Sequence, residues 1–184
     1  MSVALTEAEL RRYSRHLLLP GYGTEGQQKL LRSSALIVGL GRQGSAAALY
    51  LAAAGTGRLG LTEPEGGDLP VARYTSWRQD VTLPETIARR LRALNPSVRV
   101  EEYQGRPLEE LVGRYDVVVG CVRSPARRQE LNRICLRAGK VLVAASVWGW
   151  EGQALTVVPG EEPCWFCAVP HDRQREDDPL ASSF

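Results

Sequence analysis

The stretch Ala35-Leu36-Ile37-Val38-Gly39-Leu40-Gly41-Arg42-Gln43-Gly44 decides the fold of this 184-residue chain. Its first four residues form a short apolar run typical of a buried strand, and residues 45–54 are rich in helix formers and stop at Gly55. The Gly-x-Gly-x-x-Gly spacing therefore falls between a strand and a helix, where glycines let the backbone approach a phosphate at a helix N-terminus. The pattern predicts a nucleotide site at Gly39, Gly41 and Gly44. The alternative is a tight strand–helix junction that binds no ligand.

Strand and helix patterns alternate on both sides of this turn. Strands are expected at 58–62, 98–103, 115–119 and 140–146, with an added one at 154–158 that could run antiparallel. Helices are expected at 7–18, 24–32, 82–94 and 124–139, the first two opened by capping boxes at Thr6/Glu9 and Thr24/Gln27. Near-continuous apolar strands that alternate with helices indicate a parallel sheet covered on both faces. The chain is expected to be an α/β protein with a doubly wound, mainly parallel, Rossmann-like sheet and N-terminal helices.

Neither an internal repeat nor a linker divides the chain, so one domain over residues 1–184 is expected. Its parts would be an N-terminal helical segment at 1–33, a Rossmann-like core at 34–158, and a Cys-x-x-Cys segment with a polar, mobile tail at 159–184.

The composition excludes several classes of protein. The 23 basic and 21 acidic residues leave a net charge of +2, which gives no reason to expect a nucleic-acid partner. No apolar run approaches the ~20 residues of a membrane span, and the first residues do not resemble a secretory signal. Four cysteines fit a reduced cytoplasmic setting. Only Lys29 and Lys140 are lysines.

Glu63 follows the strand expected at 58–62 and lies 19 residues after Gly44. A carboxylate at that place can accept hydrogen bonds from both ribose hydroxyls of a nucleotide. An exposed glutamate without a ligand is the alternative.

Several motifs in collinear order carry a resemblance over nearly the whole chain. They are Arg12-Tyr13-Ser14-Arg15-His16-Leu17-Leu18-Leu19-Pro20-Gly21, the stretch 35–41, Tyr50-Leu51-Ala52-Ala53-Ala54-Gly55-Thr56-Gly57, Leu94-Asn95-Pro96, Tyr115-Asp116-Val117-Val118, Glu151-Gly152-Gln153 and Cys164-Trp165-Phe166-Cys167. Together they resemble the ThiF/MoeB/HesA family, within the ubiquitin-activating-enzyme superfamily. The chain looks like a shortened and degenerate member.

The resemblance implies an ATP- and magnesium-dependent adenylation of the C-terminal glycine of a ubiquitin-like or sulfur-carrier protein. It also implies a homodimer, or a pair of one active and one degraded subunit, with residues 1–33 as the dimerisation segment. In the family the second arginine of the Arg-Tyr-x-Arg motif reaches across the dimer to the partner's ATP phosphates, and Arg15 is that residue here. Its planar fork suits phosphate.

Two departures from the family pattern concern the phosphates. Arg42 stands where the family usually has a further glycine, and it would either clamp a phosphate or fill the space that a nucleotide needs. Arg78 is a remnant of the family's arginine–glutamine element. The family's catalytic lysine belongs between residues 65 and 95, where this chain has none; Leu83 or Pro84 stands near its place.

A third departure concerns the metal. The family's magnesium-holding aspartate falls in register with Arg123 of Cys121-Val122-Arg123-Ser124. Magnesium needs hard oxygen ligands, which an arginine cannot supply. Arg123 would repel magnesium and is expected to neutralise phosphate directly, but it cannot orient a metal, so magnesium is doubtful here.

Cys164 and Cys167 have the spacing of one zinc half-site, and a full site needs four ligands. His171 could be a third ligand and the tail supplies no fourth, so a dithiol or disulfide remnant is the alternative. Cys121 and Cys135 fit buried small residues. The cluster of Trp148, Trp150 and Trp165 fits either a contact surface or packing against the sheet.

Three functions remain open. The first is a degenerate, non-catalytic partner subunit that lends Arg15 to an intact homologue. The second is a minimal adenylating enzyme in which arginines replace the lysine and the metal. The third is an NAD-binding or purely structural homodimeric module.

Overall fold

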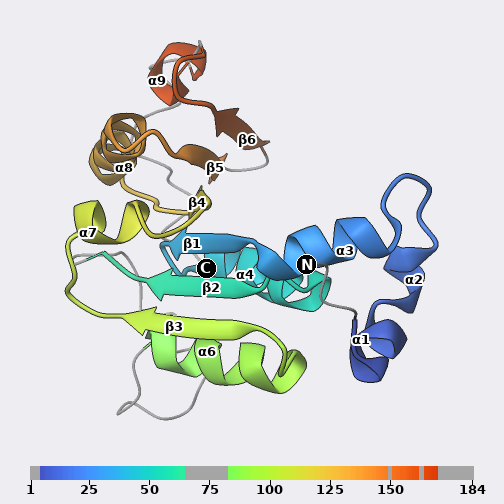
Figure 1. Ribbon diagram of the computed structural model, residues 1–184. Helices are drawn as coiled ribbons and strands as arrows, with labels where there is room; N and C mark the ends of the chain where they lie inside the picture. Colours follow the sequence, from blue (N-terminus) through green and yellow to red (C-terminus); the bar gives the residue numbers. More distant parts are fainter. Residues whose placement is uncertain (1–4, 65–82, 149–150, 162–163, 170–184) are drawn as a thin grey trace.

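The fold is seen in a computed structural model, which describes residues 5–64, 83–148, 151–161 and 164–169 (Figure 1). Six strands form one sheet in the order β3-β2-β1-β4-β5-β6. The first five strands, which pair in parallel, are β1 (Ser34–Val38), β2 (Arg58–Thr62), β3 (Arg99–Tyr103), β4 (Val117–Gly120) and β5 (Val141–Trp148). The last strand, β6 (Glu151–Val157), is antiparallel to β5. The predicted α/β architecture is confirmed, including the added antiparallel strand.

Helices cover both faces of the sheet. In chain order the described helices are α1 (Glu7–Arg12), α2 (Ser14–Leu17), α3 (Gly23–Arg32), α4 (Arg42–Ala54), α6 (Leu83–Leu94), α7 (Leu108–Val112), α8 (Pro125–Arg137) and α9 (Trp165–Ala168). Ala35 and Ile37 of β1 pack in one apolar cluster with α4 and α6. Leu36 and Val38 pack in the other with α7, α8 and α9. Because successive side chains of a strand point to opposite faces, one wholly buried strand serves both cores.

The helix expected at 7–18 is broken, because Tyr13 ends α1 and precedes α2. Its side chain is fully buried, and its hydroxyl accepts a hydrogen bond of 2.9 Å from Asn95 Nδ2. The same Asn95 nitrogen donates to the Ala52 carbonyl, 2.7 Å away. Burial of this ring against the ends of α4 and α6 thus decides where the N-terminal helices lie.

The capping box expected at Thr24/Gln27 is wrong, whereas the one at Thr6/Glu9 is present. Helix α3 begins at Gly23, and the buried Gln27 donates from Nε2 to the Ala54 carbonyl, 2.9 Å away. A tertiary contact with the end of α4 has replaced the local cap. Helices α7 and α9, of five and four residues, were not expected, since so short a segment has no clear period. Within the described ranges, every helix is too short or too polar to cross a lipid bilayer.

Candidate nucleotide site

The carboxyl ends of β1, β2 and β4 meet at one edge of the sheet. From β1 the chain passes through α4 to β2 on one side, whereas β4 pairs with β1 on the other side. This reversal of strand order is where open α/β sheets bind their ligands. The glycine turn follows β1, Glu63 follows β2, and Arg123 follows β4. The structure therefore brings these predicted site residues to the same edge.

Two of the three glycines in the turn are required by packing. Gly39 has φ 88°, a left-handed conformation, and a Cβ added to it would lie 2.7 Å from the Cys121 carbonyl oxygen. A Cβ on Gly44 would lie only 1.8 Å from the Gly39 carbonyl oxygen. These two glycines let the turn, the start of α4 and the end of β4 lie in contact.

Gly41 is different, because a Cβ added there would meet no atom within 4 Å. Its φ of −58° is also accessible to other residues, so neither packing nor backbone conformation requires a glycine. Gly41 is the N-cap of the 13-residue α4 and can offer that helix no side-chain cap. Open space therefore lies beside the positive end of a helix dipole, the arrangement that binds phosphates.

Hydrogen bonds hold this turn in place. Gly39 N donates to the Thr62 carbonyl at 3.0 Å, and the Ser45 hydroxyl donates to the Leu40 carbonyl at 2.7 Å. The half-buried Glu63 accepts a hydrogen bond from the Leu40 N–H through Oε2. The predicted acidic residue thus lies directly beside the glycine turn. Its contact with a ribose stays a prediction.

The two arginines predicted at this edge are both exposed. Arg42 is the first residue of α4. Arg123 lies three residues beyond β4, and its carbonyl accepts a hydrogen bond of 2.9 Å from Arg128 Nη2. Both cations are therefore near the turn in the fold.

Arg15 is exposed on α2, at the other end of the molecule. Figure 1 shows α1 and α2 beyond the end of the sheet at which β1 and β2 begin, opposite to the glycine turn. The hydrogen bonds that Asn95 donates to Tyr13 and Ala52 agree with this placement, because α4 and α6 end there. Arg15 therefore does not lie at the nucleotide turn of its own chain. Arg78 falls outside the described residues.

Neither lysine lies at the nucleotide turn. Lys29 is on α3, where its Nζ is 2.8 Å from Glu25 Oε1. Lys140 directly precedes β5, at the amino end of the sheet. The sequence contains no other lysine, so no part of this chain can supply a lysine to the nucleotide site.

The family resemblance implies magnesium, and the residues at this edge do not fit it. The position in register with the metal-holding aspartate carries the Arg123 cation. The carboxylate that the structure does place beside the turn, Glu63, already accepts the Leu40 N–H. Magnesium prefers several oxygen ligands, and within the described part of the chain no three His, Cys, Asp or Glu side chains gather as a metal site would require.

Cys164 and Cys167 are not joined by a disulfide, and their sulfur atoms are 3.2 Å apart. The hydrogen bond from Cys167 lowers the pKa of Cys164, although partial burial opposes this shift. Among the described residues no third metal-binding side chain joins them. His171 lies outside these residues, so the zinc half-site stays a prediction.

The remaining cysteines and tryptophans include two residues of the core. Cys135 is buried on α8, and burial raises the pKa of its thiol to about 12. Trp165 is fully buried against the same cluster, so packing rather than surface contact is its role. Trp150 and the side chain of Trp148 fall outside the described part of the chain.

The structure also has a cationic cavity at the opposite, amino end of the sheet, which the sequence did not predict. Its lining comes from five separate strands and their flanking turns, so no local motif marks it. Only the sheet order brings these residues together.

The fold is a doubly wound α/β sheet with a glycine turn at its carboxyl edge. The model of the ThiF family matches residues 13–183, and the chain belongs to this family. It is 36% identical over 181 residues to the sulfur carrier protein ThiS adenylyltransferase of Escherichia coli (strain K12), covering 94% of this chain and 72% of that protein. It is 35% identical over 181 residues to the vegetative protein HesA of Trichormus variabilis (strain ATCC 29413 / PCC 7937), covering 91% and 66%.

Solved structures agree with the fold. The E. coli tRNA N6-threonylcarbamoyladenosine dehydratase TcdA, solved in complex with ATP, aligns with a TM-score of 0.64 at 25% identity and covers 77% of this chain and 61% of its own. The chain thus spans about two thirds of these relatives. The recognition of the family and of its fold from the motifs is confirmed.

Proposed function

We propose that this chain is a non-catalytic, nucleotide-binding partner subunit of a ThiF-family adenylating enzyme. In this role it would lend Arg15 to the active site of an intact homologue that acts on a sulfur-carrier or ubiquitin-like protein. The observation that carries the proposal is the charge at the carboxyl end of β4, where the exposed Arg123 stands in the register of a metal-holding acid.

Nucleotide binding is supported by the open space at Gly41 and by the α4 N-terminus beside it. The backbone N–H groups of the turn would bind phosphate oxygens, and Glu63 would accept the ribose hydroxyls. The relative TcdA has been solved with ATP, which makes ATP the first nucleotide to test.

Loss of catalysis is supported by what this edge lacks. Lys29 and Lys140 both lie elsewhere, so no ammonium group steadies the separating phosphates. An arginine such as Arg123 can neutralise phosphate charge, but it cannot orient a metal ion that bridges phosphates.

The donation of Arg15 to a partner is supported by its place. An exposed arginine at the amino end of the sheet lies away from its own glycine turn and is free to enter another subunit (Figure 1). Arginines supplied in trans to phosphates raise rates by roughly 10³–10⁵ in other systems.

The test is ATP–pyrophosphate exchange with a carrier protein. Alone, the purified chain is expected to give no exchange, whereas mixing it with an intact ThiF-family homologue from its own host should raise that homologue's exchange rate. Arg15→Gln should abolish this increase. Arg11→Gln, another exposed arginine of the N-terminal helices, should keep it and is the matched control. Magnesium-dependent exchange by the chain alone would refute the proposal.

A minimal adenylating enzyme is the second candidate, favoured by the 36% identity to the ThiS adenylyltransferase. In that case the chain alone would exchange, and Arg42→Ala and Arg123→Ala should each abolish the activity. Binding of NAD in place of ATP, measured by calorimetry, would instead favour a dinucleotide-binding module.

A further inference from the structure

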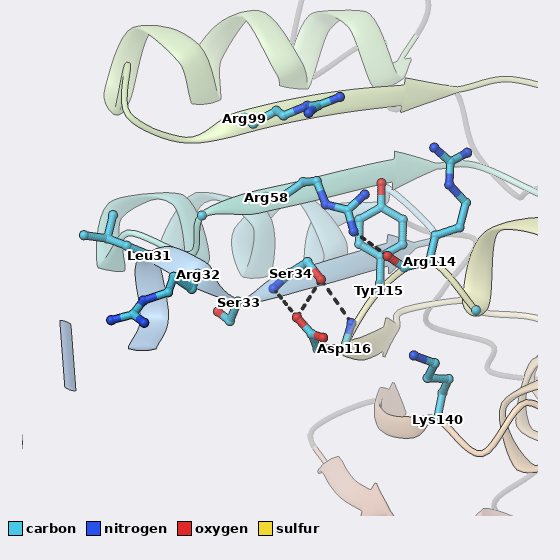
Figure 2. A pocket seen from close by; sticks show the side chains of 12 residues that line it. Leu31, Arg32, Ser33, Ser34, Arg58, Arg99, Arg114, Tyr115, Asp116 and Lys140 are labelled. Atoms are coloured by element: carbon cyan, nitrogen blue, oxygen red, sulfur yellow. Dashed lines mark hydrogen bonds between the residues drawn. The ribbon is translucent and has the colours of Figure 1, made fainter. Parts of the chain in front are cut away.

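A cavity of about 420 Å³ opens at the amino end of the sheet, opposite to the glycine turn (Figure 2). Its walls come from the end of α3, the starts of β1, β2 and β3, and the turns before β4 and β5. This volume lies within the range of small-molecule sites. None of the predicted nucleotide-site residues lines it.

The lining of the cavity is strongly cationic. One acidic residue, Asp116, and five basic residues line it; the five are Arg32, Arg58, Arg99, Arg114 and Lys140. In the whole chain the two signs almost balance, with 23 basic and 21 acidic residues. Such a local excess of one sign attracts small ions of the other sign.

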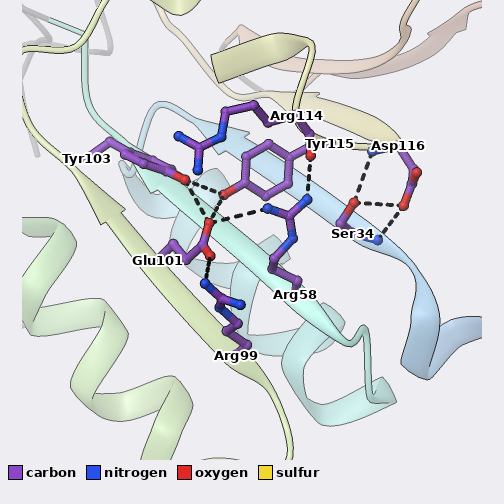
Figure 3. Close-up of polar contacts among 8 residues, drawn as sticks. All are labelled: Ser34, Arg58, Arg99, Glu101, Tyr103, Arg114, Tyr115 and Asp116. Carbon is purple, nitrogen blue, oxygen red and sulfur yellow. Dashed lines mark hydrogen bonds and ion pairs between the residues drawn. The ribbon is translucent and has the colours of Figure 1, made fainter. Parts of the chain in front are cut away.

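A partly buried polar network holds one wall of the cavity (Figure 3). Glu101 accepts hydrogen bonds from the hydroxyls of Tyr103, at 2.7 Å, and Tyr115, at 2.9 Å. Its carboxylate also pairs with Arg58 and Arg99. The Arg58 guanidinium lies 4.4 Å from the centre of the Tyr115 ring. Arg58 is therefore held in one place before any ligand arrives, which lowers the entropic cost of binding.

Two cations of the lining keep their donors available. The Lys140 ammonium makes no hydrogen bond or ion pair with any described residue. The pKa of Asp116 is lowered mainly by its hydrogen bonds from Ser34, and the nearby Lys140 charge lowers it further. The Arg114 guanidinium lies 5.5 Å from the Tyr103 ring centre and, within the described part of the chain, donates no hydrogen bond.

The one acidic side chain of the lining is largely engaged. Asp116 Oδ2 accepts hydrogen bonds from Ser34 N at 2.8 Å and Ser34 Oγ at 2.7 Å, as Figure 2 shows. This carboxylate ties the start of β1 to the start of β4, and a structural role explains its presence among the cations. It does not neutralise the cavity.

We propose that this cavity is a second anion site, which takes a small oligophosphate with at least two phosphate groups. Arginine forks match phosphate oxygens, and four of the five cations are arginines. A volume of about 420 Å³ has room for more than one phosphate group. The cavity also offers no bare aromatic face to a nucleobase, because Arg58 already covers the Tyr115 ring.

Calorimetric titration of the full chain with inorganic pyrophosphate at low salt tests this site. The wild-type chain should bind pyrophosphate, and Arg114→Gln/Lys140→Gln should weaken that binding at least about tenfold, since two charge-assisted contacts are lost. Arg106→Gln/Arg133→Gln removes the same charge from exposed positions outside the cavity and should leave the affinity unchanged. Inorganic monophosphate should bind more weakly than pyrophosphate.

Further control measurements distinguish binding at this cavity from binding at the nucleotide turn and from unspecific attraction between opposite charges. Gly41→Ala, at the nucleotide turn, should leave pyrophosphate binding at the cavity intact even where it weakens any binding at the turn, so a failure of the proposed nucleotide site does not affect this result. Lys140→Gln alone breaks no contact of the fold and should still weaken binding. The inference fails if pyrophosphate does not bind, if both double variants lose affinity equally, or if only Gly41→Ala does. Equal binding of an acidic peptide and of pyrophosphate would also overturn it, because the site would then bind any anion and would not be specific for phosphate groups.

Discussion

At the scale of single residues, Gly41 and Gly44 belong to one turn but are glycines for different reasons. Alanine is the better helix former, by about 1 kcal/mol, and Gly44 lies within α4. Its added Cβ would nevertheless overlap the Gly39 carbonyl oxygen, 1.8 Å away. At Gly41 the same methyl group would enter open space.

We therefore expect Gly44→Ala to lower the free energy of unfolding by about 2 kcal/mol or more, because backbone would have to shift. Gly41→Ala should change it by less than about 0.5 kcal/mol while weakening ATP binding at least about tenfold. Urea unfolding followed by circular dichroism measures the first effect, and calorimetric titration with ATP measures the second. An unchanged ATP affinity in Gly41→Ala would show that the open space does not receive a phosphate.

At the scale of elements, Asn95 joins three helices that lie far apart in sequence. It follows α6, donates to the carbonyl of Ala52 in α4, and donates to the hydroxyl of Tyr13 between α1 and α2. Both Asn95 and Tyr13 are fully buried. Polar groups left unpaired in such a place are costly. This junction holds the N-terminal helices, and with them Arg15, against the rest of the fold.

Asn95→Ala is expected to destabilise the chain by about 2–4 kcal/mol, since it leaves the Ala52 carbonyl and the Tyr13 hydroxyl without this partner. Tyr13→Phe removes only the hydroxyl and should cost about 1 kcal/mol. In the double variant the two effects should not add, because they share one hydrogen bond. Additive losses in urea unfolding would mean that the two side chains act independently.

At the scale of the whole molecule, the two ends of the sheet differ in what they can bind. The carboxyl end has the glycine turn, the α4 N-terminus and Glu63. The amino end has the cationic cavity and, next to it, the N-terminal helices. A ligand that binds only the folded chain raises its stability in proportion to the logarithm of ligand concentration.

ATP is therefore expected to raise the midpoint of thermal unfolding, with a stabilisation of about 2.7 kcal/mol at 100 times the dissociation constant. Removal of magnesium with EDTA should leave this shift unchanged, because Arg123 stands in the register of the family's metal-holding aspartate and Glu63 already accepts the Leu40 N–H. The measurement is scanning calorimetry of the full chain, and the Gly41→Ala variant, whose ATP binding should be weakened, should show a smaller shift at the same ATP concentration. A shift that EDTA abolishes would place a metal ion in the site.

Much of this protein follows from local sequence. The apolar run 35–38, the glycine spacing after it and the alternation of strands and helices determine a doubly wound sheet, since these patterns depend on near neighbours. The same spacing places the nucleotide turn, and the motifs identify the ThiF family. The features that depend on contacts between residues far apart in the chain were decided only by the tertiary structure. It broke the first helix at Tyr13 and turned Gln27 from a cap into a contact with α4. It also gathered the cationic cavity from the end of α3, the starts of three strands and the turns before two others. Buried polar groups must find partners wherever the fold provides them, and this requirement leaves no periodic trace in the sequence.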